Sequence, residues 1–167
     1  MKTIEECYTT LAPKLTNWLV ATGSTYHEAC DLVQEVFLKI WKMRDSLRDD
    51  DSSVSGLVFT IARNLRKNLA RDNRRLVFVD EIKDEDAGSV DAAPLPSDAA
   101  YLRRRLTEAF AQLPPILRDA YTLFQIGELS IREIASQTGV SENLVKVRIH
   151  RAKEKLKEIL ADLRVTF

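Results

Sequence analysis

The chain has 167 residues, enough for one ordinary domain or two small ones, and it is rich in Ala, Leu, Glu, Lys and Arg. No apolar run approaches the roughly 20 residues of a membrane span, and the first residues do not form a signal peptide. Its two cysteines lack neighbours at metal-ligand spacing, which favours buried thiols over ligands or a disulfide. We expect an all-α cytoplasmic protein without a metal, cofactor, catalytic site or membrane insertion of its own.

The formal net charge is zero because opposite charges lie in separate segments. Residues 63–75 and 143–157 each carry six cations and one acid, whereas residues 79–98 carry seven acids and one cation. Residues 79–98 also contain two prolines and lack apolar periodicity. They predict a flexible acidic linker between an N-terminal domain, residues 1–78, and a C-terminal domain, residues 99–167.

Two helices are predicted first in chain order. One covers Ile4 to Ala21, interrupted or bent near Pro13, and the other runs from about Tyr26 to Met43. The core stripe of the second helix comprises Val33, Val36, Phe37 and Ile40. The opposite stripe comprises Asp31, Gln34, Glu35, Leu38 and Lys42. That opposite stripe is either a docking surface for a basic partner helix or an ordinary exposed face.

A polar loop over Arg48–Ser53 is expected to precede a third helix. The apolar face of this helix repeats at steps of three and four and comprises Val54, Leu57, Val58, Ile61, Leu65 and Leu69. The opposite face comprises Arg63, Asn64, Lys67, Asn68, Arg71, Arg74 and Arg75. A basic face of this kind contacts nucleic acid, an acidic protein or only water. Phe59 either stacks on an exposed base or packs in the core.

Helices are also predicted over Ala100–Ala111 and from Pro114 to about Ile126. After them, Ser130 and Glu133 have the spacing of a capping box, which starts a further helix. Gly139 is placed to end that helix.

The residues after Gly139 predict one more helix, capped by Ser141. Two short capped helices that meet at a glycine are typical of a helix-turn-helix, whose second helix enters the DNA major groove. Its inward stripe comprises Val145, Ile149, Ala152, Leu156, Leu160 and Leu163. Its outward face comprises Asn143, Lys146, Val147, His150 and Arg151, side chains that can contact base edges or phosphates. A solvated charged helix end is the alternative interpretation.

Several segments, in order, resemble the bacterial extracytoplasmic-function (ECF) sigma factors of the sigma-70 family. DLVQEVFL at 31–38 is similar to the family's segment that binds core polymerase, and FTIARNL at 59–65 to its promoter-melting helix. LPP at 113–115, LSIREIA at 129–135 and VKVRIHRA at 145–152 are similar to its second DNA-binding domain.

The resemblance implies an alternative sigma factor that binds core RNA polymerase and directs it to promoter DNA. The residues implied in polymerase binding are Asp31, Gln34, Glu35 and Leu38. Those implied in reading and opening the −10 element are Phe59, Arg63, Asn64, Lys67, Arg71, Arg74 and Arg75. Those implied at the −35 element are Asn143, Lys146, Val147, His150 and Arg151, with Arg148 holding phosphate. An anti-sigma factor is a further partner that the family leads us to expect.

Two other functions fit parts of the sequence. A stand-alone helix-turn-helix repressor or activator would use its N-terminal domain to dimerise and would bind duplex DNA alone. An adaptor protein would use only the stripe from Asp31 to Lys42.

Overall fold

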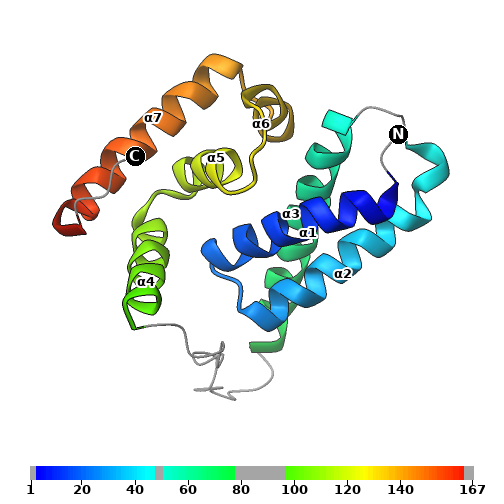
Figure 1. Cartoon of the computed structure of the whole chain (residues 1–167), viewed down its shortest axis with the longest axis horizontal. Helices are drawn as coiled ribbons and strands as arrows, with labels where there is room; N and C mark the ends of the chain where they lie inside the picture. Colours follow the sequence, from blue (N-terminus) through cyan, green and yellow to red (C-terminus); the bar gives the residue numbers. More distant parts are fainter. Residues whose placement is uncertain (1–2, 48–50, 78–96, 164–167) are drawn as a thin grey trace.

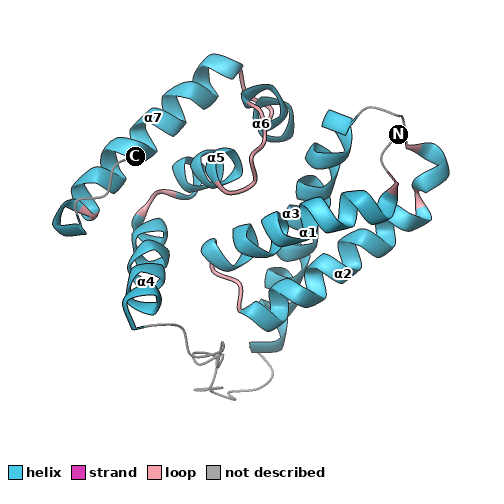
Figure 2. Cartoon of the chain, in the orientation of Figure 1, coloured by secondary structure: helices cyan, strands magenta, loops and turns pink. Residues whose placement is uncertain are grey.

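The computed structural model describes residues 3–47, 51–77 and 97–163, and all regular elements in these ranges are helical (Figure 2). The N-terminal helices are α1 (Ile4–Ala21), α2 (Tyr26–Lys42), the short 3-10 helix η1 (Arg44–Ser46) and α3 (Asp51–Val77). The C-terminal ones are α4 (Ser97–Gln112), α5 (Pro115–Gln125), α6 (Ile131–Thr138), α7 (Glu142–Ile159) and the 3-10 helix η2 (Ala161–Leu163). The all-α prediction is confirmed. The linker predicted over 79–98 lies outside the described residues, except for its last two, which belong to α4.

Capping boxes start both α1 and α2. The Glu28 amide donates to the Thr25 hydroxyl at 3.2 Å, and the Thr25 amide donates to the Glu28 carboxylate at 2.9 Å. Thr3 and Glu6 make the same pair of bonds before α1. Each box satisfies backbone N–H groups that the first helical turn leaves without partners, so local sequence is enough to set these starting points. Pro13 lies inside α1, and the helix continues on both sides of it.

The start of α3 differs from the prediction. Asp51, Ser52 and Ser53 were expected in a loop, but they form the first turn of the helix. Polar composition alone suggested a loop; Asp and Ser are also favoured where a helix begins, because they interact well with its free N–H groups. The prediction was therefore wrong over these three residues.

The apolar face of α3 is also shorter than predicted. Val58 and Leu65 are buried, whereas Leu69 is 42% exposed. With 27 residues against 17, α3 is much longer than the α2 helix it packs on. No apolar surface therefore covers the turn of α3 at Leu69.

The C-terminal helices contain the predicted helix-turn-helix. Ser130 and Glu133 form the capping box of α6, with bonds of 3.1 and 2.8 Å. Gly139 ends α6 at φ +69°, a left-handed conformation that favours glycine. The Ser141 hydroxyl then accepts the Leu144 amide at 3.2 Å and caps α7. These local bonds fix the turn that orients α7.

The two groups of helices pack against each other (Figure 1). Helices α5 and α6 both contact α7, while α2 lies against α1 and α3. Between the groups, α1 contacts α4 and α5, and α3 contacts α6. The buried apolar side chains of both groups form one continuous cluster. The N-terminal core is thus covered in part by the C-terminal helices.

The left-handed backbone at Gly139 gives a testable stability difference. Gly139→Ala should lower the free energy of unfolding by about 1 kcal/mol, because an L side chain is strained at this φ although no atom lies within 4 Å of its Cβ position. Gly139→Asn should lower the free energy of unfolding by less, since Asn adopts left-handed φ values more readily than Ala. Urea unfolding followed by circular dichroism measures both. Gly56→Ala, inside α3 with only ordinary contacts near its Cβ, should instead raise the stability.

Candidate nucleic-acid and partner interfaces

The two faces of α7 differ sharply. Val145, Ile149, Ala152 and Leu156 are buried against the neighbouring helices. The predicted outward residues are all exposed: Asn143, Lys146, Val147, His150 and Arg151. Arg148 is half-buried between the two faces. The first turns of α7 therefore present donors, cations and one apolar contact on a single face, as a helix in the major groove requires.

The basic face of α3 contains two kinds of side chain: some are exposed to solvent, and others contact neighbouring helices. Asn64, Lys67 and Arg71 are exposed to solvent. Arg74 and Arg75 lie within the helical range of α3, but their side chains lie outside the described part of the chain. Only part of the predicted −10 surface is therefore open.

Arg63 is one of the residues that contact a neighbouring helix. Its side chain is only 17% exposed, and one of its Nη atoms lies 3.5 Å from the Asp119 carboxylate of α5. Phe59 is fully buried, with its ring edge-on to Trp18 at a centroid distance of 5.5 Å and an angle of 75°. In this arrangement neither side chain is free to contact DNA.

Arg66, a cation of α3 outside the predicted basic face, packs within the N-terminal helices. Its guanidinium lies 4.5 Å from the centroid of the Trp18 ring and donates to the Thr22 hydroxyl. Burial lowers the pKa of Arg66 from its usual value, and the nearby Asp119 carboxylate opposes that shift. Arg66 thus fastens α3 to α1 rather than reaching solvent.

The acidic stripe of α2 is exposed along its length. Asp31, Gln34 and Glu35 all face solvent, and Leu38 is 59% exposed. An apolar side chain this open, beside two carboxylates, fits a surface that another molecule covers.

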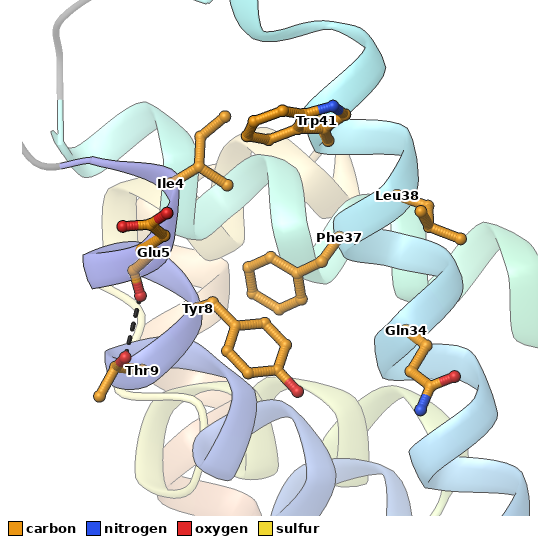
Figure 3. A pocket seen from close by; sticks show the side chains of 8 residues that line it. All are labelled: Ile4, Glu5, Tyr8, Thr9, Gln34, Phe37, Leu38 and Trp41. Atoms are coloured by element: carbon orange, nitrogen blue, oxygen red, sulfur yellow. Dashed lines mark hydrogen bonds between the residues drawn. The ribbon is translucent and has the colours of Figure 1, made fainter.

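A groove of about 540 Å³ borders this stripe between α1 and α2 (Figure 3). Its walls comprise Ile4, Glu5, Tyr8, Thr9, Gln34, Phe37, Leu38 and Trp41. Tyr8 stands edge-on to Phe37 at 4.9 Å, and Trp41 lies at the far end, half exposed, with Arg44 stacked on its ring at 4.5 Å. The groove is therefore mostly apolar, and Glu5 is the one carboxylate among the residues that line it.

Tyr8 and Trp41 were missed by the sequence analysis. Trp41 falls three residues after Leu38 on the predicted outward stripe of α2, so helical spacing could have found it. Tyr8 belongs to α1, and only the packing of α1 on α2 brings it to the groove.

Two negative findings concern the described ranges only. No group of three or more His, Cys, Asp or Glu side chains is placed there to hold a metal ion. No helix among them is long and apolar enough to cross a membrane.

Two consecutive segments match known protein families. Residues 7–76 match the family described as Sigma-70 region 2, and residues 103–156 match the family described as Sigma-70, region 4. The first segment contains the α2 stripe, most of the residues that line the groove and most of α3, and the second contains α5, α6 and most of α7.

Several curated proteins are similar over nearly the whole chain. The RNA polymerase sigma factor CarQ of Myxococcus xanthus is 31% identical over 95% of this chain and 90% of its own length. The ECF RNA polymerase sigma factor RpoE of Cereibacter sphaeroides is 30% identical over 92% of this chain and 83% of its own.

Solved structures agree with these similarities. The sigma factor RpoE in complex with the anti-sigma factor NepR, from Bartonella quintana, superposes with a TM-score of 0.73 at 26% identity, covering 96% of this chain and 98% of that one. CnrH in complex with the cytosolic domain of CnrY, with a TM-score of 0.70 at 21% identity, covers 97% of this chain and 89% of that one and shares the fold.

CarQ and the two RpoE proteins are sigma factors, and their similarity to this chain extends across both of the segments that match Sigma-70 regions. The chain belongs to the extracytoplasmic-function RNA polymerase sigma factors of the sigma-70 family, alternative sigma factors that direct RNA polymerase to specific promoters.

Proposed function

We propose that this sigma factor holds core polymerase with the stripe and groove of α2, contacts the −10 element with α3, and contacts the −35 element with α7. The observation that carries the proposal is the separation of faces on α7, where every predicted base-contacting residue is exposed and the opposite stripe is buried. A charged helix that only faces solvent would not require hydrogen-bond donors gathered on one face immediately after a capped turn.

The chemistry of α7 suits a duplex. Lys146 and Arg151 can donate to guanine or phosphate, Asn143 can pair with adenine, and Val147 can touch a thymine methyl group. His150 lies on the same exposed face. Arg148, at the edge of that face, is placed to hold a phosphate.

The chemistry of α3 suits an opened duplex. Asn64, Lys67 and Arg71 form an exposed polar and basic line along the helix, and Arg74 and Arg75 continue it in sequence. Flipping a base out of the duplex costs a few kcal/mol, which such contacts can offset. Phe59 and Arg63 can join this surface only after α5 moves away from α3, because the C-terminal helices contact both.

The chemistry of α2 suits a helical partner. Asp31 and Glu35 provide negative charge beside Leu38 and Trp41, so the surface fits an amphipathic helix whose apolar ridge is flanked by cations. We propose that core RNA polymerase supplies this helix.

The cellular location and the regulatory partner that we propose both follow from the family to which the chain belongs. Core polymerase and promoter DNA occupy the bacterial cytoplasm, so we place this chain there as an initiation factor that is not itself an enzyme. The Bartonella relative is solved with the anti-sigma factor NepR, which supports an anti-sigma factor as a partner here as well.

Run-off transcription over a library of genomic promoters, with and without the protein, tests the function directly. Start sites that depend on this protein are expected with core polymerase. Lys146→Glu with Arg151→Glu should reduce transcription from those promoters by at least about tenfold, because two groove contacts become repulsive. Lys155→Glu with Lys157→Glu makes the same charge change at exposed positions further along α7 and should reduce transcription far less. If no promoter in the library gives a start site that depends on this protein, the proposed function is wrong.

Polymerase binding is tested by reversing the charge of the α2 stripe. Asp31→Arg with Glu35→Arg should abolish co-purification with core polymerase, since the partner helix would face cations instead of carboxylates. Glu108→Arg with Glu158→Arg makes an equal charge change at exposed sites on α4 and α7 and should leave binding intact. Undiminished co-purification of the α2 variant would contradict the assignment of this stripe.

The groove is tested by removing its exposed indole. Trp41→Ala should weaken binding to core polymerase by about tenfold or more, as expected when a buried aromatic anchor of an interface is lost. Tyr26→Ala removes another exposed aromatic from the same helix but outside the groove, and it serves as the control. Titration of labelled polymerase measures both affinities, and equal losses for the two variants would rule out a specific role for the groove.

A further inference from the structure

Helix α7 begins differently from the three other described helices that have a Ser or Thr cap. Thr3, Thr25 and Ser130 each precede a helix, and a glutamate three residues later returns a hydrogen bond to the cap. Ser141 accepts the Leu144 amide at 3.2 Å in the same way, but leucine stands where the other three helices have glutamate. Leu144 has no acceptor with which to return the second bond of a capping box.

Neither charge nor packing explains this leucine. A glutamate here would face the phosphates of DNA bound to α7, which accounts for the lack of a carboxylate. Glutamine, however, would complete the capping box without a negative charge. The apolar contact that staples the start of a helix belongs to the fourth helical residue, here Val145, which is fully buried, whereas Leu144 is 39% exposed. The Leu144 side chain is therefore placed for a contact outside the chain.

Val147 extends the same apolar surface. It lies three residues after Leu144 and is 41% exposed. Residues at this spacing are neighbours on a helix, with Cβ atoms about 5–6 Å apart. Valine is β-branched and a poorer helix former than alanine or lysine, so at an exposed position it contributes little to the stability of α7. Its one preferred rotamer does hold the methyl groups in a fixed direction, which suits a contact with a partner.

The residues around this apolar pair are those of a surface that reads DNA. Asn143 and Lys146 lie on one side of it and Arg151 lies one turn further along, and all three are exposed. Among the groups that distinguish base pairs in the major groove, only the C5-methyl of thymine is apolar. Successive bases rise by about 3.4 Å along a strand, so two side chains about 5–6 Å apart reach neighbouring base pairs.

We infer that Leu144 and Val147 are specificity-determining residues: each packs on the C5-methyl group of a pyrimidine, at neighbouring base pairs of the −35 element. In unmodified DNA these pyrimidines are thymines, and 5-methylcytosine carries the same group. The inference rests on the proposed assignment of α7 to the −35 element and adds which chemical group the helix selects there. Burial of one methyl group favours binding by about fourfold, so two contribute about fifteenfold.

Deoxyuridine tests the inference, because it pairs like thymidine and lacks only the C5-methyl group. Core polymerase with the full-length protein is assayed by run-off transcription, at limiting holoenzyme, on a promoter that depends on the protein. Thymines of its −35 element are replaced by deoxyuridine one at a time, on either strand. Transcription should fall about fourfold at each of two neighbouring base pairs and about fifteenfold when both are replaced. The same replacements in the spacer between the two promoter elements should change nothing.

Single variants identify the side chains responsible. Leu144→Ala should abolish the difference between thymine and deoxyuridine at one of the two base pairs, and Val147→Ala should abolish it at the other. Both positions are exposed and alanine is a good helix former, so circular dichroism should show unchanged helix content. Lys146→Ala is the matched control on the same face: it removes a donor and should lower transcription from both templates, with their ratio at the parental value.

A methylated cytosine separates the methyl group from the rest of thymine. Replacing a contacted T·A pair by C·G should weaken transcription. Placing 5-methylcytosine at the same position should raise it about fourfold above the cytosine template. No increase would show that another atom of thymine is read, which would contradict the inference.

The remaining outcomes distinguish this inference from the proposed function. Equal transcription from thymine and deoxyuridine templates throughout the −35 element would overturn the inference and leave the proposed function intact, because the start sites would still depend on the protein. A deoxyuridine effect that persists in both alanine variants would overturn it as well. If no start site depends on the protein or on the sequence of a −35 element, the proposed function is wrong, and the inference is wrong with it.

Discussion

The hydrogen bond from the Trp18 indole to Thr122 joins two parts of the chain that are 104 residues apart. An indole N–H buried without an acceptor is costly, so α5 stabilises the N-terminal core by supplying that acceptor. Phe59 shares the constraint because its ring lies between Trp18 and Gly127. The burial of Phe59 and the pairing of Arg63 with Asp119 both follow from the position of α5 against α3.

The basic face of α3 shows the consequence. Its residues alternate between two environments because one side of the helix turns toward α5 and α6 while the rest faces solvent. Arg63 therefore pairs with Asp119, and Lys67, one turn further, is free. The Asp119 carboxylate therefore competes for the Arg63 guanidinium with any other anion.

The groove between α1 and α2 has a different physical origin. Tyr8 packs edge-on against Phe37, whereas Leu38 and Trp41 remain 59% and 50% exposed. Exposed apolar side chains gathered in a groove are uncommon in a monomer, and here the Glu5 carboxylate lies beside them. The groove is formed by the first turns of α1 and by the outward stripe of α2.

The features that could be predicted from the sequence have local signals. Each capping box spans four residues and a glycine ends α6, so the limits of α1, the start of α2 and the helix-turn-helix were predictable, as were the two faces of α7 from helical periodicity. Tertiary contacts, by contrast, set the exposure of Leu69, the position of Tyr8 in a groove, and the covering of Phe59 and Arg63. These outcomes depend on contacts between segments far apart in the chain, and periodicity shows which face of a helix is apolar but not which neighbour covers it.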